Sequence, residues 1–282
     1  MLHVEATVSD WFQQLQNPVF DWLTSVISLL ASEWFYVLII PLIFWMFDKH
    51  LGFRLLYVYS FSMYLHVFLN QVIIIDRPAA GIQGNGFSTF PSGPVQAATT
   101  FWGYLIPEVA KRSFSLLAVL MIGIISFVTL YTGAHLLFDV LGAVLIGSFI
   151  VYAAYRSLDW VGGMPDPFRF SFSLVLPCAL LLLFPESAHY AGLLLGTGIG
   201  FSFEQVKVRM LISPHWSRKF LAAIVGLTGL FLIVYIGTFL SPTVLIHFLH
   251  FTFLGLWITL IAPYLFVRLR LFEQDGKIYM DS

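Results

Sequence analysis

The segment Asp76–Gly93, DRPAAGIQGNGFSTFPSG, is a polar stretch rich in Gly, Pro and hydroxyl residues, set between two apolar runs. A membrane-embedded chain tolerates such backbone only in water or lining a polar cavity. Ser92 can cap the apolar helix predicted to follow, and the free N–H groups at such a helix start form a natural anion site. Arg77, near the other end, is a candidate counter-charge. The segment therefore predicts an anion pocket suited to phosphate at a membrane surface.

The composition predicts an all-α, polytopic transmembrane helix bundle. Of 282 residues, 59% are hydrophobic and only 10% are charged, and the mean hydropathy is +0.87. Soluble domains carry about 25% charged residues. The net charge of −1 argues against a nucleic acid partner. The single cysteine, Cys178, excludes an internal disulfide. The N-terminus lacks a basic region followed by an apolar core, so we expect no cleaved signal peptide.

The order of apolar and polar stretches predicts three regions. Residues 7–32 alternate polar and apolar positions at roughly helical spacing, which is typical of an interfacial helix. Apolar segments suited to membrane spans then lie at about 34–47, 55–75, 94–110, 114–131, 135–155, 170–184, 188–203, 220–240 and 243–267. The more polar piece Arg156–Arg169 is the best internal boundary. We therefore predict an interfacial helix at 1–32, a core at 33–160 carrying the anion site, and further transmembrane helices at 161–282.

The distribution of basic residues predicts the orientation. If the Lys49–Arg54 turn is cytoplasmic, alternating spans place thirteen of the fourteen Lys and Arg residues on that side. This asymmetry is what the positive-inside rule requires. The N-terminus is then outside and the C-terminus is cytoplasmic. Arg77 is the exception, a cation on the outer face beside the polar segment.

A second informative stretch is YTGAHLLFDVLG at 131–142. His135 and Asp139 are four residues apart, so they are predicted to share one helix face at the outer start of a helix. A carboxylate one turn away can hold one ring nitrogen and leave the other free as nucleophile or base. Taken alone, such a pair favours a structural hydrogen bond. The shared outer level and the lone outer arginine favour a functional one.

These residues resemble the type 2 phosphatidic acid phosphatases, integral membrane lipid-phosphate phosphatases related to vanadium haloperoxidases. The family pattern is K-x-x-x-x-x-x-R-P, then P-S-G-H, then S-R-x-x-x-x-x-H-x-x-x-D. This sequence has NQVIIIDRP at 70–78, FPSGP at 90–94 and VTLYTGAHLLFD at 128–139. The resemblance covers roughly residues 15–160. It implies a PAP2/haloperoxidase-like core followed by extra C-terminal helices, and the subgroup suggests a bacterial plasma membrane.

The resemblance also implies roles for five residues. His135 would attack phosphorus and form a phosphohistidine, while Asp139 orients it. Arg77, Ser92 and the Gly93 backbone N–H would hold the phosphate oxygens. Such a site needs no metal or organic cofactor, and its partner would be a lipid phosphate or a prenyl (di)phosphate such as undecaprenyl diphosphate.

The sequence departs from the family pattern at three site positions. Asn70 stands at the lysine position, Pro94 at the histidine position and Thr129 at the second arginine position. The loss of one preorganised donor slows catalysis by about 10²–10³. Proline can neither donate a proton nor offer an N–H, and general acid catalysis contributes about 10²–10⁴. An acid matters least for a phosphate leaving group, so residual activity should favour diphosphates.

Polar residues near these positions could partly substitute for the lost groups. They are His66, Gln71, Gln83, Asn85, Gln96 and Tyr131. None of them brings a fixed positive charge.

Three hypotheses of function remain open from the sequence. The first is a catalytically degraded member of the family, a pseudoenzyme with an outward-facing lipid-phosphate pocket and weak or no hydrolysis. The second is an active lipid phosphatase or diphosphatase using His135 as nucleophile. The third is a transporter of another class, which would need a polar path where the back half offers little beyond Glu204. The oligomeric state and the role of the helices after residue 170 are not encoded in any recognisable motif.

Overall fold

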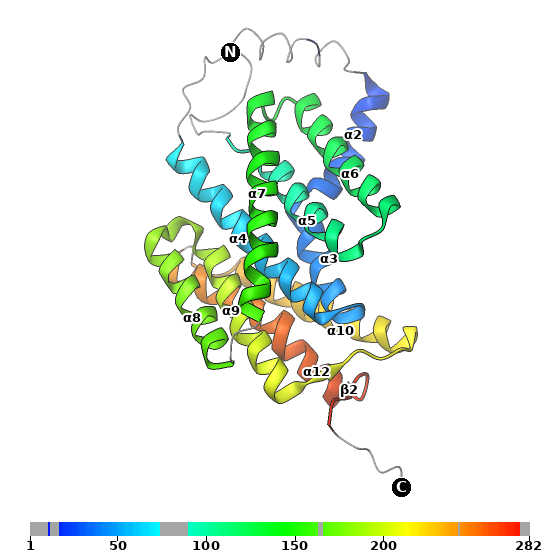
Figure 1. The fold of residues 1–282 in the computed structure, drawn as a ribbon, viewed down its shortest axis with the longest axis vertical. Coiled ribbons are helices and arrows are strands. Elements are labelled where there is room, and N and C mark those ends of the chain that lie inside the picture. Colours follow the sequence, from blue (N-terminus) through cyan, green and yellow to red (C-terminus); the bar gives the residue numbers. More distant parts are fainter. Residues whose placement is uncertain (1–10, 12–16, 74–89, 163–165, 242, 277–282) are drawn as a thin grey trace. The chain divides into compact units, whose positions relative to one another are not determined.

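The protein is almost wholly helical, as predicted. The computed structural model describes the chain apart from residues 1–10, 12–16, 74–89, 163–165, 242 and 277–282 (Figure 1). The α-helices are α2 Pro18–Ala31, α3 Glu33–Met46, α4 Lys49–Val72, α5 Gly93–Val109, α6 Arg112–Tyr131, α7 Leu137–Gly162, α8 Asp166–Leu183, α9 Ala188–Phe203, α10 Trp216–Gly237, α11 Val244–Leu256 and α12 Ala262–Arg268. A 3-10 turn, η1 Pro185–Ser187, precedes α9, and the π-helical segments are η2 Glu204–Val208 and η3 Trp257–Ile261. Within the described ranges, the only strands are β1 Met210–Leu211 and β2 Glu273–Gln274, which pair antiparallel.

Among the residues that the structure describes, four helical stretches are long and apolar enough to cross a membrane. They are Arg112–Tyr131, Leu137–Ser157, Trp216–Gly237 and Val244–Arg268, judged by length and composition. Helices α2 and α3 together would make a fifth, bent by 48° at their junction. Each of the nine predicted apolar segments lies largely in a helix of the described chain, but several are shorter or more polar than these four. The chain is thus an integral membrane protein, while nine spans and an interfacial first helix stay predictions.

The chain folds into two compact units. The first comprises residues 1–37 and 62–157, and the second comprises residues 38–61 and 158–282. In the first unit α5, α6 and α7 pack together (Figure 1). Their shared core is Val95, Ala98, Ile125, Val140 and Ala143, each less than 5% exposed. This packing holds the start of α5 and the start of α7 at one end of the unit.

Helix α2 is fastened to the C-terminal end of α6. Asn17 caps α2 by accepting hydrogen bonds from the Val19 and Phe20 N–H groups at 3.1 Å. The Tyr131 hydroxyl donates to Asp21 Oδ1 at 2.7 Å and accepts from the Asn17 N–H at 3.3 Å. Tyr131 therefore joins α2 to the turn that carries His135.

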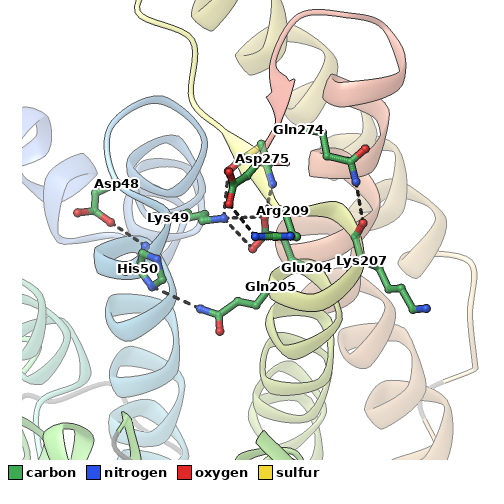
Figure 2. A network of polar contacts seen from close by, with 10 residues as sticks. Asp48, Lys49, His50, Glu204, Gln205, Lys207, Arg209, Gln274 and Asp275 are labelled. Carbon is green, nitrogen blue, oxygen red and sulfur yellow. Dashed lines mark hydrogen bonds and ion pairs between the residues drawn. The ribbon is translucent and has the colours of Figure 1, made fainter. Parts of the chain in front are cut away.

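In the second unit, Glu204 is fully buried at the end of α9 and is held by an ion pair (Figure 2). Lys49 Nζ donates to its two carboxylate oxygens at 2.9 and 3.2 Å, and the Met210 N–H donates to Oε1 at 2.8 Å. The partners tie α4 and β1 to the π-turn that begins at Glu204. A carboxylate so engaged is a structural anchor, which removes the main support that the sequence offered for a polar transport path.

Candidate functional site

A row of polar residues runs between α4 and α5 inside the first unit, and we call it the polar seam. It consists of Ser62, His66 and Asn70 on α4 and Ser92, Gln96 and Thr100 at the start of α5 and along it. In each set the residues recur every four positions, so they lie on one helix face. The seam brings residues that are remote in sequence into one polar strip within an apolar bundle.

Hydrogen bonds join the two sides of the polar seam. At the end of the seam farther from Ser92, the Ser62 and Thr100 hydroxyls lie 2.8 Å apart. Gln96 Nε2 donates to the Ser62 carbonyl at 2.8 Å and to its hydroxyl at 3.1 Å. At the opposite end of the seam, Asn70 Nδ2 donates to the Phe90 carbonyl at 3.4 Å. The sequence singled out Gln96 but missed Ser62 and Thr100, whose only signal was their four-residue spacing from His66 and Gln96.

Ser92 occupies the N-cap position of α5, but the predicted side-chain cap is wrong. Its hydroxyl makes no capping hydrogen bond, although the residue is fully buried. A cap accepts from the second or third helical N–H. Pro94, the second helical residue, has none, and the remaining candidate donor, the Val95 N–H, makes no such bond with Ser92. Among the described residues Ser92 Oγ has no hydrogen-bond partner. Its hydroxyl therefore remains available to a ligand.

His135 precedes α7 instead of lying on it, which corrects the predicted shared helix face. The Asp139 and Val140 N–H groups donate to the Leu136 carbonyl at 3.1 and 3.2 Å, so the helix starts after Leu136. Asp139 Oδ2 in turn accepts from the Leu136 N–H at 3.0 Å, which is the returning half of a capping box. The same oxygen lies 3.7 Å from His135 Nδ1. The turn, and not helical spacing, brings imidazole and carboxylate together.

The starts of α5 and α7 are joined at the site. The Ser92 N–H donates to the Asp139 carbonyl at 3.2 Å. Asp139 is fully buried, whereas the His135 side chain remains 17% exposed and so can be reached by a ligand. Three predicted site residues thus lie at one end of the first unit, with Gly93 next to Ser92. Arg77 lies outside the described residues.

The three residues that depart from the family pattern all fit the local structure, two through a hydrogen bond and one through its position in a helix. Asn70 bonds the Phe90 carbonyl, as described above. Thr129 is buried on α6 and its hydroxyl donates to the Ile125 carbonyl at 2.7 Å, within its own helix. Pro94 lies in the first turn of α5, where a missing N–H costs little. All three side chains are neutral, so none of these positions carries a positive charge.

No group of three or more metal-ligating side chains occurs in the part of the chain that the structure describes. Among the described residues, the site offers a hydroxyl, helix-terminal N–H groups and an imidazole. These are groups that bind and attack an oxyanion such as phosphate.

Comparisons with known proteins agree with this chemistry. Residues 34–162 match the PAP2 superfamily, and residues 188–274 match the PAP2 superfamily phosphatase transmembrane extension. The chain is 25% identical over 192 residues to sphingosine-1-phosphate phosphatase 2 of Homo sapiens, covering 63% of this chain and 48% of the human protein. The Mus musculus protein of that name is 25% identical over 193 residues, covering 63% of this chain and 54% of its own.

The chain thus spans about half the length of the curated relatives it matches. No solved structure matches it. The two family matches together cover most of the helical chain, and they include every family motif position from Asn70 to Asp139. The chain belongs to the PAP2 superfamily.

Proposed function

We propose that this protein binds the phosphate or diphosphate group of a membrane lipid in an outward-facing pocket and hydrolyses it only slowly. The pocket would use Ser92, Gly93 and Arg77 to hold oxygens, with His135 as nucleophile and Asp139 orienting it. The observation that carries the proposal is the buried Ser92 hydroxyl, which has no partner among the described residues and stands at the N-terminus of α5.

An anion is the ligand that suits this position. Helix α5 spans 17 residues, and its first-turn N–H groups and dipole favour negative charge at its start. Nearly all buried polar groups in proteins are hydrogen-bonded, and leaving one unsatisfied costs about 1–3 kcal/mol. A phosphate oxygen at the start of α5 would satisfy Ser92 Oγ and the helix N–H groups together. The names of the relatives, sphingosine-1-phosphate phosphatases, support a lipid phosphate as the ligand class.

The rate is proposed to be low because the groups that neutralise and protonate the transferring phosphate are missing. Asn70 and Thr129 bring no charge, and Pro94 brings no proton. Each lost donor slows catalysis by about 10²–10³, and loss of the acid by about 10²–10⁴. Because a phosphate leaving group needs the acid least, undecaprenyl diphosphate should be hydrolysed faster than phosphatidic acid.

Binding and turnover are measured separately on the purified full chain in detergent. Dioctanoyl phosphatidic acid should raise the thermal unfolding temperature, and dioctanoylglycerol, which lacks the phosphate, should not. Phosphate release should be faster from undecaprenyl diphosphate than from phosphatidic acid, and absent in His135→Ala. His247→Ala, in the second unit, is the matched control and should behave as wild type. Absence of phosphate-dependent stabilisation would refute the pocket, and turnover above about 1 s⁻¹, as in ordinary enzymes, would favour the active phosphatase instead.

The cause of the low rate is tested by restoring the family groups. The triple variant Asn70→Lys, Pro94→His and Thr129→Arg should raise phosphate release at least about a hundredfold. The increase should vanish when His135→Ala is added. A triple variant that folds, binds and stays inert would contradict the residue assignment.

A further inference from the structure

The imidazole of His66 lies against the bare backbone of Gly93 at the start of α5. An added Cβ at Gly93 would lie 3.0 Å from His66 Nε2 and 3.2 Å from its Cε1. Real side chains seldom tolerate so close an approach, so any residue larger than glycine would press on the ring. The glycine therefore admits an imidazole from α4 to the N-terminus of α5.

The two side chains beside this glycine each carry a buried polar atom without a partner in the described chain, although the His66 atom nearest to Gly93 is Nε2 and Nδ1 lies farther away on the ring. His66 Nδ1 and Ser92 Oγ are both buried, and neither has a hydrogen-bond partner among the described residues. Gln96 Oε1, one turn further along α5 in the polar seam, is a third such atom. Buried polar groups are almost always hydrogen-bonded in folded proteins. The Ser92 hydroxyl and a protonated His66 Nδ1 can donate, which suits a ligand that accepts hydrogen bonds at this helix start, whereas Gln96 Oε1 is an acceptor and would need a different partner.

His66 has the chemistry that the neighbouring positions lack. A neutral imidazole that carries its proton on Nδ1 is a hydrogen-bond donor. Asn70, one turn further along α4, already uses its amide on the Phe90 carbonyl, and Pro94 has no N–H.

We propose that His66 is a ligand-contacting residue of the phosphate site, donating its Nδ1–H to an oxygen of the lipid phosphate. It provides part of the oxyanion binding that the family lysine and histidine positions no longer supply. The inference rests on the proposed function, because it assigns a further residue to the same pocket.

The test uses the full chain in detergent with dioctanoyl phosphatidic acid as the probe, titrated by calorimetry. His66→Phe keeps the ring against Gly93 but has no donor, and it should weaken binding by about 10- to 100-fold, as expected for one hydrogen bond to a charged group. His66→Asn places an amide close to the position of Nδ1 and should stay within about fivefold of wild type. His66→Gln, whose amide reaches towards the position of Nε2, should bind more weakly than the asparagine variant. His247→Phe, the same substitution in the second unit, should bind as wild type.

Thermal unfolding without ligand separates a binding role from a packing role. Replacing a buried polar atom that has no protein partner by an apolar ring is neutral or stabilising, so His66→Phe should unfold at or above the wild-type temperature. A lower unfolding temperature together with weaker binding would assign His66 to packing and overturn the inference.

The remaining outcomes are also decisive. If wild type binds the probe and His66→Phe binds it equally well, His66 is no ligand contact and the proposed function stands. If the His66→Asn variant binds the probe as weakly as the His66→Phe variant, the assignment of the hydrogen bond to Nδ1 is wrong. If wild type itself does not distinguish phosphatidic acid from dioctanoylglycerol, the proposed function fails first.

Discussion

At the residue scale, Glu204 and Asp275 are both carboxylates with a basic partner, but their surroundings differ. The Lys49–Glu204 pair has side-chain exposures of 18% and 0%, and the Arg209–Asp275 pair has 50% and 54%. Glu204→Ala would leave the Lys49 ammonium without its counter-charge and the Met210 N–H without its acceptor. We expect a loss of about 3–5 kcal/mol in the free energy of unfolding.

Asp275→Ala is the matched control for Glu204, because it also removes a carboxylate 2.9 Å from a cation. Solvent screening limits such an exposed pair to about 0–1 kcal/mol. Both values can be measured by denaturant unfolding in the same detergent. Equal losses at the two sites would show that burial of Glu204 does not determine the strength of its pairing.

The site residues show what residue type alone can predict. Ser92, His135 and Asp139 were found from motif chemistry, and the structure brings them to one end of the first unit. Two predicted details were wrong, the side-chain cap of α5 and the first residue of α7, and each depends on local backbone groups. Pro94 removes one of the two donors that a capping serine can use, and the helix that was predicted to begin at His135 begins after Leu136.

At the element scale, α9 and α11 approach each other through glycines spaced four residues apart. A methyl group at Gly196 would overlap the Thr252 carbonyl oxygen and lie 3.0 Å from the Leu256 nitrogen. Backbone atoms cannot rotate away, so Gly196→Ala must push the two helices apart. Overpacking of this kind costs about 1–3 kcal/mol.

Gly123 on α6 offers the opposite case, because nothing lies within 4 Å of a methyl group placed there. Gly123→Ala should stabilise the protein by up to about 1 kcal/mol through helix propensity. The two alanine variants, compared by unfolding in one detergent, should therefore change stability with opposite signs. A Gly196→Ala variant as stable as wild type would contradict the close approach of α9 and α11.

The helices themselves were predictable from apolar runs, because a chain in lipid must satisfy its backbone groups internally. Their irregularities were not. The π-turn η3 joins α11 to α12 without any glycine in it, and the 48° bend between α2 and α3 falls at Ser32–Glu33, inside an otherwise apolar pattern. Ser32 there donates to the Leu29 carbonyl at 2.6 Å and accepts from the Phe35 N–H at 3.4 Å. Such local competition for backbone groups leaves little trace in hydropathy.

At the scale of the whole molecule, helix pairing is what the sequence does not reveal. The four-residue spacing of Ser62, His66 and Asn70 is visible in the sequence, as is that of Ser92, Gln96 and Thr100. Neither set indicates that α4 faces α5. The pairing turns two weak patterns into one polar seam and places His66 beside Gly93. Sequence reasoning named His66 only as one of several nearby polar residues for this reason.

Orientation in the membrane is a property of the whole chain and can be tested at the two ends of α6. Ser113 and Ala134 are small, exposed residues just inside its start and just beyond its end. Each is changed to cysteine in a Cys178→Ala background, which removes the single native thiol. The asymmetry of basic residues predicts that the Ala134 end lies outside, so a membrane-impermeant maleimide should label Ala134→Cys in intact cells.

Ser113→Cys should react only after the cells are permeabilised, and Cys178→Ala alone should not react at all. Ala134 is next to His135 in the chain, so dioctanoyl phosphatidic acid should also slow its labelling if the pocket holds a lipid phosphate there. The reverse labelling pattern would place the pocket on the cytoplasmic side. A lipid phosphate would then have to reach Ser92 and His135 from the inner leaflet, and the proposed outward-facing function would be wrong even if binding were confirmed.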